Sequence, residues 1–236
     1  MSVSRFALAG LFVIFISCGV NAEDSDRSLL DYAVGINQAG QSRSGTGVFF
    51  GDGFVLTASH VVGSGLLQGP TVTIAGQQIP ARTVKQDTFE QSDLALLSVD
   101  EQLVPMSLHQ RKLSLCDKPP WPGQDVVVVI PEEAVHSHVL SPAWLPLKAR
   151  QYDTVIGDVA STGNSGSGVF DAQSKCLLGI MSRKISQFYT RKDTGKKETF
   201  DIAKYFVPAS KIMEFLPHNL RVKLSGPSLD TAAPAQ

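Results

Sequence analysis

Short apolar runs that alternate with turn residues constrain this chain more than any other feature of its sequence. Several runs are rich in Val and Ile, and Gly, Pro, Asp and Asn fill the gaps between them. Residues 51–53 read Gly-Asp-Gly between two runs, which is typical of a tight turn joining two strands. Helical periodicity is scarce, so the sequence predicts an all-β sandwich or barrel. The expected strands cover residues 32–36, 47–50, 54–58, 71–74, 94–99, 126–130, 168–170, 177–182 and 205–207.

A proline-rich segment at residues 118–123 divides these strands into two groups. Proline lacks the amide donor that a central strand needs, so we expect a connection between two β units there. A short C-terminal helix is predicted over residues 208–216, where Ile212 and Phe215 share one face and Pro217 ends the run. The expected boundaries are a signal segment at 1–22, an N-terminal extension at 23–31, a first unit at about 32–115, a second unit at about 123–207, the helix, and a disordered tail at 219–236.

The first 22 residues are expected to direct export. Arg5 precedes an apolar run at residues 6–16, and a small-residue cleavage site ends at Ala22. The run is shorter than the roughly 20 apolar residues that a spanning helix needs, although an uncleaved anchor and lipid attachment at Cys18 stay open as alternatives. No later segment is apolar enough to cross a membrane. We therefore predict a periplasmic or secreted protein with no membrane span once the signal is removed.

Charge and cysteine use agree with export. Removing residues 1–22 takes away Arg5 and no acidic side chain, so the net charge changes from −1 to −2. Such a charge gives no general attraction to nucleic acid, and nucleic acid is not a predicted partner. The two remaining cysteines, Cys116 and Cys176, are able to form a disulfide in an oxidising compartment, with two free, half-buried thiols as the alternative.

Three short segments carry candidate catalytic residues. Residues 53–62 deliver His60 just past the end of an expected strand, where an imidazole can be held in one orientation. Asp93 stands immediately ahead of another strand, where its carboxylate can accept the imidazole N–H and fix the tautomer. Ser165 lies in a glycine-rich run, residues 163–168, that lets the backbone turn tightly and expose the hydroxyl. Taken singly, the three also read as a packing histidine, a turn-capping aspartate and a flexible loop.

Residues 57–60 (Thr-Ala-Ser-His), 92–95 (Ser-Asp-Leu-Ala) and 163–167 (Gly-Asn-Ser-Gly-Ser) together resemble the three signatures of chymotrypsin-like (trypsin-fold) serine proteases, in that family's order. The run at 205–212 resembles the end of the protease domain in bacterial Deg-type enzymes, here without a PDZ domain. The resemblance covers residues 32–218 and implies two antiparallel six-stranded β-barrels with the active site in the cleft between them. It implies a serine endopeptidase acting on proteins or peptides, with no metal or organic cofactor. A protease-fold binding or regulatory protein with little turnover is the alternative.

By this resemblance Ser165 attacks the peptide carbonyl, His60 accepts its proton and Asp93 orients His60. The amides of Gly163 and Ser165 form the oxyanion hole. The substrate-binding residues implied are Val159, Ala160, Thr162, Ser182, Arg183 and Lys184. Val159 falls at the base of the primary specificity pocket, although a one-residue shift would put Asp158 there. Residues 182–184 match the strand that pairs with bound substrate, and their two cations either face solvent or favour acidic substrates.

The candidate oxyanion loop departs from the family pattern. Asn164 replaces the usual Asp, Ser167-Gly168 replaces Gly-Pro, and no Ile-Val-Gly-Gly activation sequence precedes the first strand. We therefore expect a loop that is either preformed or ordered by an activating partner. The cations at residues 191–197 are interpreted as a solvated hairpin turn rather than a recognition patch. One candidate metal cluster consists of Glu132, Glu133, His136 and His138. It lacks a third fixed ligand at a recognisable spacing, so no metal site is predicted there.

Overall fold

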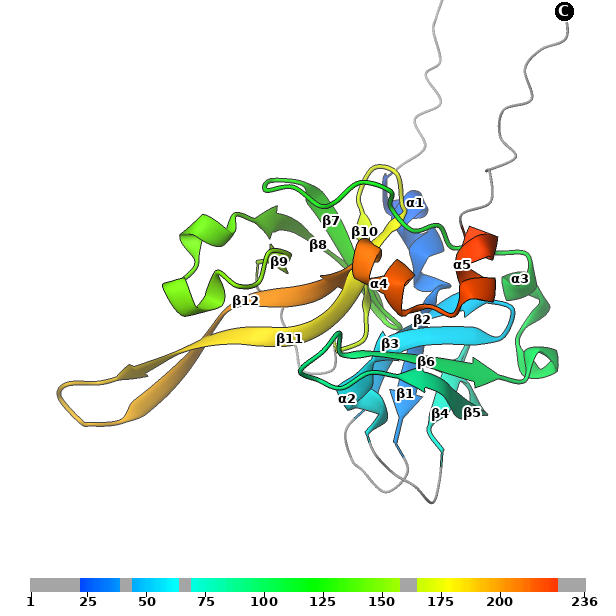
Figure 1. Ribbon diagram of the computed structural model, residues 1–236, viewed down its shortest axis with the longest axis horizontal. Helices are drawn as coiled ribbons and strands as arrows, with labels where there is room; N and C mark the ends of the chain where they lie inside the picture. The colour runs from blue at the N-terminus through cyan, green and yellow to red at the C-terminus, as the bar shows by residue number, and fades with distance from the viewer. Residues whose placement is uncertain (1–21, 39–43, 64–68, 158–164, 225–236) are drawn as a thin grey trace, which may run out of the picture.

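The computed structural model describes residues 22–38, 44–63, 69–157 and 165–224, and it confirms the expected fold of two closed, six-stranded antiparallel β-barrels (Figure 1). The first barrel contains β1 (Ala33–Asn37), β2 (Ser44–Gly51), β3 (Phe54–Ala58), β4 (Thr71–Ile74), β5 (Gln77–Gln86) and β6 (Leu94–Val99). The second contains β7 (Asp125–Ile130), β8 (Glu133–Leu140), β9 (Val155–Ile156), β10 (Gly168–Asp171), β11 (Leu177–Thr190) and β12 (Lys197–Pro208). The two barrels have the same strand order once the strands of each are numbered from its own first strand: β4-β5-β6-β3-β2-β1 and β10-β11-β12-β9-β8-β7.

The fold has three apolar cores: one inside each barrel and one between the two barrels. Successive side chains of a strand point to opposite faces, so Val55 of β3 lies inside the first barrel while Leu56 lies in the core between the barrels. In β7, Val128 lies inside the second barrel and Val127 joins the same inter-barrel core. All four side chains are at most 1% exposed. Strands buried on both faces explain why the sequence shows unbroken apolar runs at these places.

Three strands escaped the sequence analysis: β9 because it has only two residues, and β5 and β8 because little of either is buried. In β5 only two of the ten residues are buried, and in β8 only one of the eight. A strand with so little buried surface has a weak apolar signal, and its backbone pairing with neighbouring strands defines it instead.

Short helices flank the barrels, and the last of them corrects the expected start of the disordered tail. The helices are α1 (Ala22–Leu30), α2 (Ser59–Val62), α3 (Met106–His109), α4 (Ala209–Phe215) and α5 (His218–Leu224), with 3-10 turns at Glu101–Leu103, Pro142–Trp144 and Leu147–Ala149. Residues 219–224, expected as disordered tail, form most of α5 because Leu220 is buried in the inter-barrel core. The N-terminal extension forms α1, where Leu29 joins that core and Asp26 pairs with Lys175 and His136.

A disulfide joins Cys116, which follows the first barrel, to Cys176 in the turn before β11. The two Cα atoms are 5.1 Å apart and the residues are 60 positions apart in the sequence. A crosslink over a loop of this length stabilises a fold by about 4 kcal/mol in the chain-entropy account. Within the described residues, no helix is long and apolar enough to span a membrane. The predicted signal segment lies outside the described residues, apart from Ala22 at the start of α1.

Candidate active site

Strand pairing brings His60 next to Asp93. β3 ends at Ala58, and the chain turns directly into α2, which carries His60. β6 begins at Leu94, which is the register partner of Ala58. The residues just beyond these paired strand ends, His60 and Asp93, therefore lie together although 33 positions separate them.

The Asp93 carboxylate is completely buried and accepts hydrogen bonds from several donors. Nδ1 of His60 lies 2.9 Å from Oδ2 and 3.1 Å from Oδ1, and the backbone N–H of His60 donates to Oδ1 at 3.1 Å. The Ser182 hydroxyl donates to Oδ2 at 2.5 Å. A buried charge requires such partners, since water cannot reach it. Because an ionised carboxylate only accepts, Nδ1 carries a proton and the neutral imidazole keeps Nε2 as its basic nitrogen.

The backbone of Asp93 is held as firmly as its side chain. Its φ of +52° lies in the left-handed region, which aspartate enters more readily than most residues. Its N–H donates to the carbonyl of Thr88 at 3.0 Å, and its carbonyl accepts from the N–H of Ser59 at 2.9 Å. These bonds hold the backbone that carries the carboxylate.

Phe89 packs against His60, and Arg183 packs in turn against Phe89; sequence reasoning did not find these contacts. The Phe89 ring meets the imidazole edge-on, with ring centroids 5.6 Å apart and an interplanar angle of 86°. The Arg183 guanidinium lies 4.0 Å from the Phe89 ring centroid and donates to the Phe89 carbonyl oxygen at 2.6 Å. Arg183, which is predicted to bind substrate, links β11 to the segment that packs on the histidine.

Ser165 lies three residues before β10, and its backbone is hydrogen-bonded to the first barrel. Its carbonyl accepts from the N–H of Thr46 at 2.9 Å, and the next amide, that of Gly166, donates to the Met181 carbonyl at 2.8 Å. Gly166 has a φ of +87°, and a Cβ added there would lie 1.9 Å from the Thr46 carbonyl oxygen. Only glycine fits this close approach, which gives a structural reason for one glycine of the predicted loop.

The other predicted site residues fall into two groups. Ser182 is 1% exposed and its hydroxyl is directed at Asp93 rather than at solvent, while Lys184 pairs with Asp201 at 2.8 Å. The following lie outside the described residues: Gly163, Val159, Ala160 and Thr162, with Asp158 and Asn164. Within the described residues, no cluster of histidine, cysteine or carboxylate side chains could hold a metal. His136, a member of the candidate metal cluster, contacts Asp26 at 2.8 Å instead.

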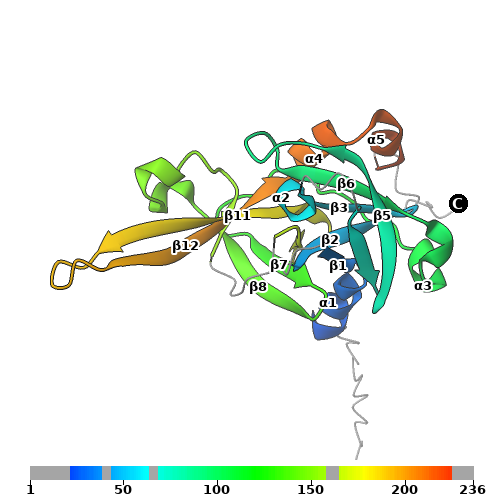
Figure 2. The same ribbon diagram turned by 90° about the horizontal axis from the view of Figure 1, so that it is seen from below.

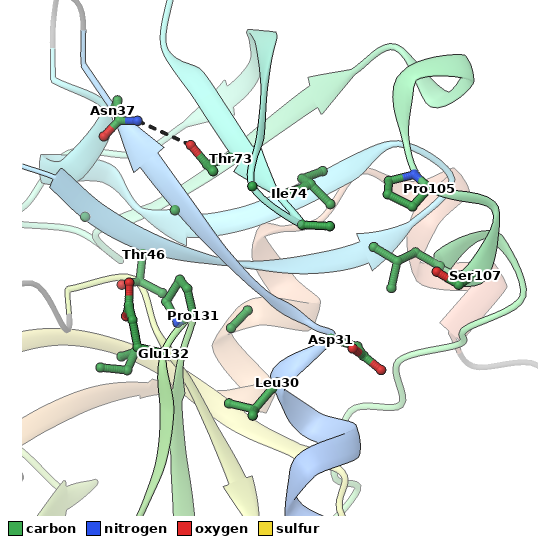
Figure 3. Close-up of a pocket in the computed structure, with 17 residues that line it drawn as sticks. Leu30, Asp31, Asn37, Thr46, Thr73, Ile74, Pro105, Ser107, Pro131 and Glu132 are labelled. Carbon is green, nitrogen blue, oxygen red and sulfur yellow. Dashed lines mark hydrogen bonds between the residues drawn. The ribbon is translucent and has the colours of Figure 1, made fainter.

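A groove of about 700 Å³ lies beside the first barrel, apart from the three candidate catalytic side chains. In Figure 3 Thr46 and Glu132 lie at one side of it, Pro105 lies at the other, and Asn37 points to Thr73. The Asn37 amide donates to the Thr73 hydroxyl at 3.4 Å. None of His60, Asp93 and Ser165 lines this groove.

Comparisons with known proteins agree with this geometry. Solved structures that resemble the chain include the Rv3671c protease from M. tuberculosis in its active form, with a TM-score of 0.57, 16% identity, and 91% of this chain and 92% of that chain covered. The serine endoprotease from Yersinia pestis has a TM-score of 0.58 and 18% identity, over 87% of this chain and 68% of that chain. The HtrA-type protease AlgW, solved with a tripeptide, has a TM-score of 0.60 and 18% identity, over 87% of this chain and 64% of that chain.

At these identities the solved structures establish the shared fold. No curated protein matches the chain. The family model of the trypsin-like peptidase domain matches residues 45–180, which is more than half of the sequence and includes all three candidate catalytic residues. The chain therefore belongs to the trypsin-like peptidase family.

Proposed function

We propose that this protein is an exported serine endopeptidase that cleaves peptide bonds through an acyl-enzyme intermediate. The observation that carries the proposal is the hydrogen bonding of His60 to the buried Asp93 carboxylate, which leaves Nε2 free to act as a base. In this mechanism Nε2 takes the Ser165 hydroxyl proton as the oxygen attacks the substrate carbonyl, and later gives that proton to the leaving amine.

Asp93 has two roles in the proposed mechanism. It fixes the histidine tautomer, and it stabilises the imidazolium that forms when His60 accepts the proton. The Ser182 hydroxyl and the His60 amide keep the carboxylate pointing at Nδ1. The amides of Gly163 and Ser165 are proposed to bind the oxyanion, each being worth about 3 kcal/mol in the transition state. The disulfide between Cys116 and Cys176 supports export to an oxidising compartment, either the periplasm or the exterior.

A fluorophosphonate probe tests the proposal directly, since it reacts only with an activated serine. Wild type is expected to be labelled, and Ser165→Ala is expected to remain unlabelled. Ser167→Ala is the matched control, because it removes the other serine of the same loop and should leave labelling intact. Equal labelling of wild type and Ser165→Ala would refute the assignment. A folded wild type that neither reacts nor cleaves a diverse peptide library would identify a protease-fold binding protein instead.

A further inference from the structure

β11 and β12 continue beyond the second barrel as a two-stranded arm, which we define as residues 186–201. The register pairs Ser186 with Asp201 at its base and Thr190 with Lys197 near its tip. Both views show this hairpin projecting away from the two barrels (Figures 1 and 2). A two-stranded ribbon on its own is only marginally stable in water, so a projecting arm of this length suggests a binding partner.

The arm exposes large aromatic side chains on both of its faces. Phe188 and Tyr189 of β11 are 77% and 52% exposed, and Phe200 of β12 is 53% exposed. Phe188 and Tyr189 are neighbours on one strand, so their rings lie on opposite faces. Aromatic rings concentrated on one projecting element are typical of a recognition surface rather than of an ordinary protein exterior.

One backbone edge of β11 is also unpaired. β10 pairs with β11 as far as Ile180, and Met181 makes the last two bonds on that side: its amide donates to the Ser167 carbonyl at 2.9 Å, and its carbonyl accepts from the Gly166 N–H at 2.8 Å. From Ser182 to Thr190, no strand among the described residues pairs with this edge, while β12 covers the opposite edge. Unpaired N–H and C=O groups along an extended strand can take up another extended chain.

This free edge begins at the catalytic site. Its first residue, Ser182, donates to the Asp93 carboxylate, and from there the strand runs outward to the tip of the arm. Eight residues separate Ser182 from Thr190, which is about 26 Å of extended chain. A polypeptide lying along the edge would therefore reach the catalytic residues at one end and the aromatic rings at the other.

We propose that the arm binds the part of the substrate upstream of the scissile bond, added to β11 as a further antiparallel strand; this rests on the proposed endopeptidase function. Every strand pair in this barrel is antiparallel. In an antiparallel addition the substrate runs opposite to β11, so its upstream residues lie toward Thr190. Substrate residues about five to nine positions upstream then pair with the arm, where Phe188 and Tyr189 contact apolar side chains.

The charges at the tip indicate what lies furthest upstream. Arg191 is already paired with Asp193 and Glu198. Lysines without an acidic partner among the described residues also lie at the tip: Lys192, Lys196 and Lys197. The preferred substrate is thus an extended segment with apolar residues beside the arm and acidic residues beyond them.

Peptides of different length test this proposal. Fluorogenic peptides share one cleavable core and extend either four or ten residues upstream, with apolar residues and then acidic residues in the extension. The longer peptide is expected to be cleaved by wild type with a kcat/KM about tenfold higher, because several cross-strand pairs contribute. N-methylation scanned along the extension should reduce this gain at every second position, which is the pattern of strand pairing.

Variants locate the effect on the arm. Replacing residues 187–200 by Asn-Gly, a sequence suited to a two-residue hairpin turn, should remove the length-dependent gain and leave cleavage of the short peptide unchanged. Phe188→Ser should lose most of the gain. Phe200→Ser is the matched control, because Phe200 is also an exposed phenylalanine of the arm but lies on β12, one strand further from the proposed substrate.

A separate binding measurement distinguishes this proposal from the proposed function. The Ser165→Ala variant is titrated with the long fluorescein-labelled peptide, and fluorescence anisotropy should show binding that is lost when the arm is shortened. Equal cleavage of long and short peptides by wild type would overturn the arm proposal and keep the endopeptidase. Arm-dependent peptide binding without cleavage by wild type would overturn the endopeptidase and keep the arm as a polypeptide-binding edge. Arm-dependent sedimentation with phosphatidylglycerol vesicles, with no effect of peptide length, would identify a membrane surface as the partner instead.

Discussion

Removing the Ser182 hydroxyl tests how strongly the catalytic geometry depends on a residue that should not touch the reacting atoms. Ser182→Ala deletes the 2.5 Å bond to Oδ2 of Asp93, and no water can replace it because both side chains are buried. A hydrogen bond to a buried charged group is worth about 2 kcal/mol, and serine to alanine leaves almost no cavity. If this energy also serves to orient the carboxylate in the transition state, kcat should fall roughly 30-fold.

The assay measures kcat and KM separately with a short fluorogenic peptide, and the free energy of unfolding by urea titration. We expect kcat to fall while KM stays close to wild type, since Ser182 holds Asp93 rather than the substrate. Ser186→Ala is the matched control. Ser186 lies on β11 like Ser182, and its hydroxyl donates at 2.7 Å to a different carboxylate, that of Asp201. This partly buried bond lies away from Asp93, so its loss should change the free energy of unfolding little and leave kcat unchanged. An unchanged kcat in Ser182→Ala would refute the positioning role, and a rise in KM alone would assign Ser182 to substrate binding.

Two further predictions concern the backbone and pH. Gly166→Ala should destabilise the fold by at least about 3 kcal/mol in urea titrations and abolish fluorophosphonate labelling. Gly76→Ala is the control: Gly76 has a φ of +82° but open space around it, so this change should cost only about 1 kcal/mol. Similar losses in the two variants would contradict the packing argument. Burial raises the pKa of Asp171, but hydrogen bonds, chiefly from Ser174 and Gln124, outweigh it and hold the pKa below its ordinary value of 3.8. The resulting contribution to stability is under about 1 kcal/mol, because the Asp171 side chain is partly exposed. This contribution is present above pH 3.8 and is lost as the pH falls through the folded-state pKa. Asp171→Asn should therefore flatten the acid limb of a curve of unfolding free energy against pH, and an unchanged limb would count against this account.

Much of the fold was predictable because its strands are buried on both faces. Val55-Leu56 and Val127-Val128 each serve two cores, so their runs are apolar throughout and easy to recognise. The helix α5 was not predictable, because its place depends on Leu220 reaching a core made by residues distant in the sequence. Leu220 and Leu224 are one helical turn apart, but this pattern covers only seven residues, and only the assembled barrels provide the surface that buries Leu220.

The candidate site divides in the same way. Sequence motifs identified His60 and Asp93, because the short segments around strand ends are local. The partners of Arg183 are not local: Phe89 lies 94 positions away, and only the approach of β11 to the first barrel brings the two together. A cation beside a candidate active site reads as a substrate-binding group in sequence, but here its guanidinium is engaged with Phe89, which in turn packs on His60. If charge selects the substrate, the selecting residues must therefore be sought beyond the end of β11, where the lysines at the tip of the arm have no acidic partner among the described residues.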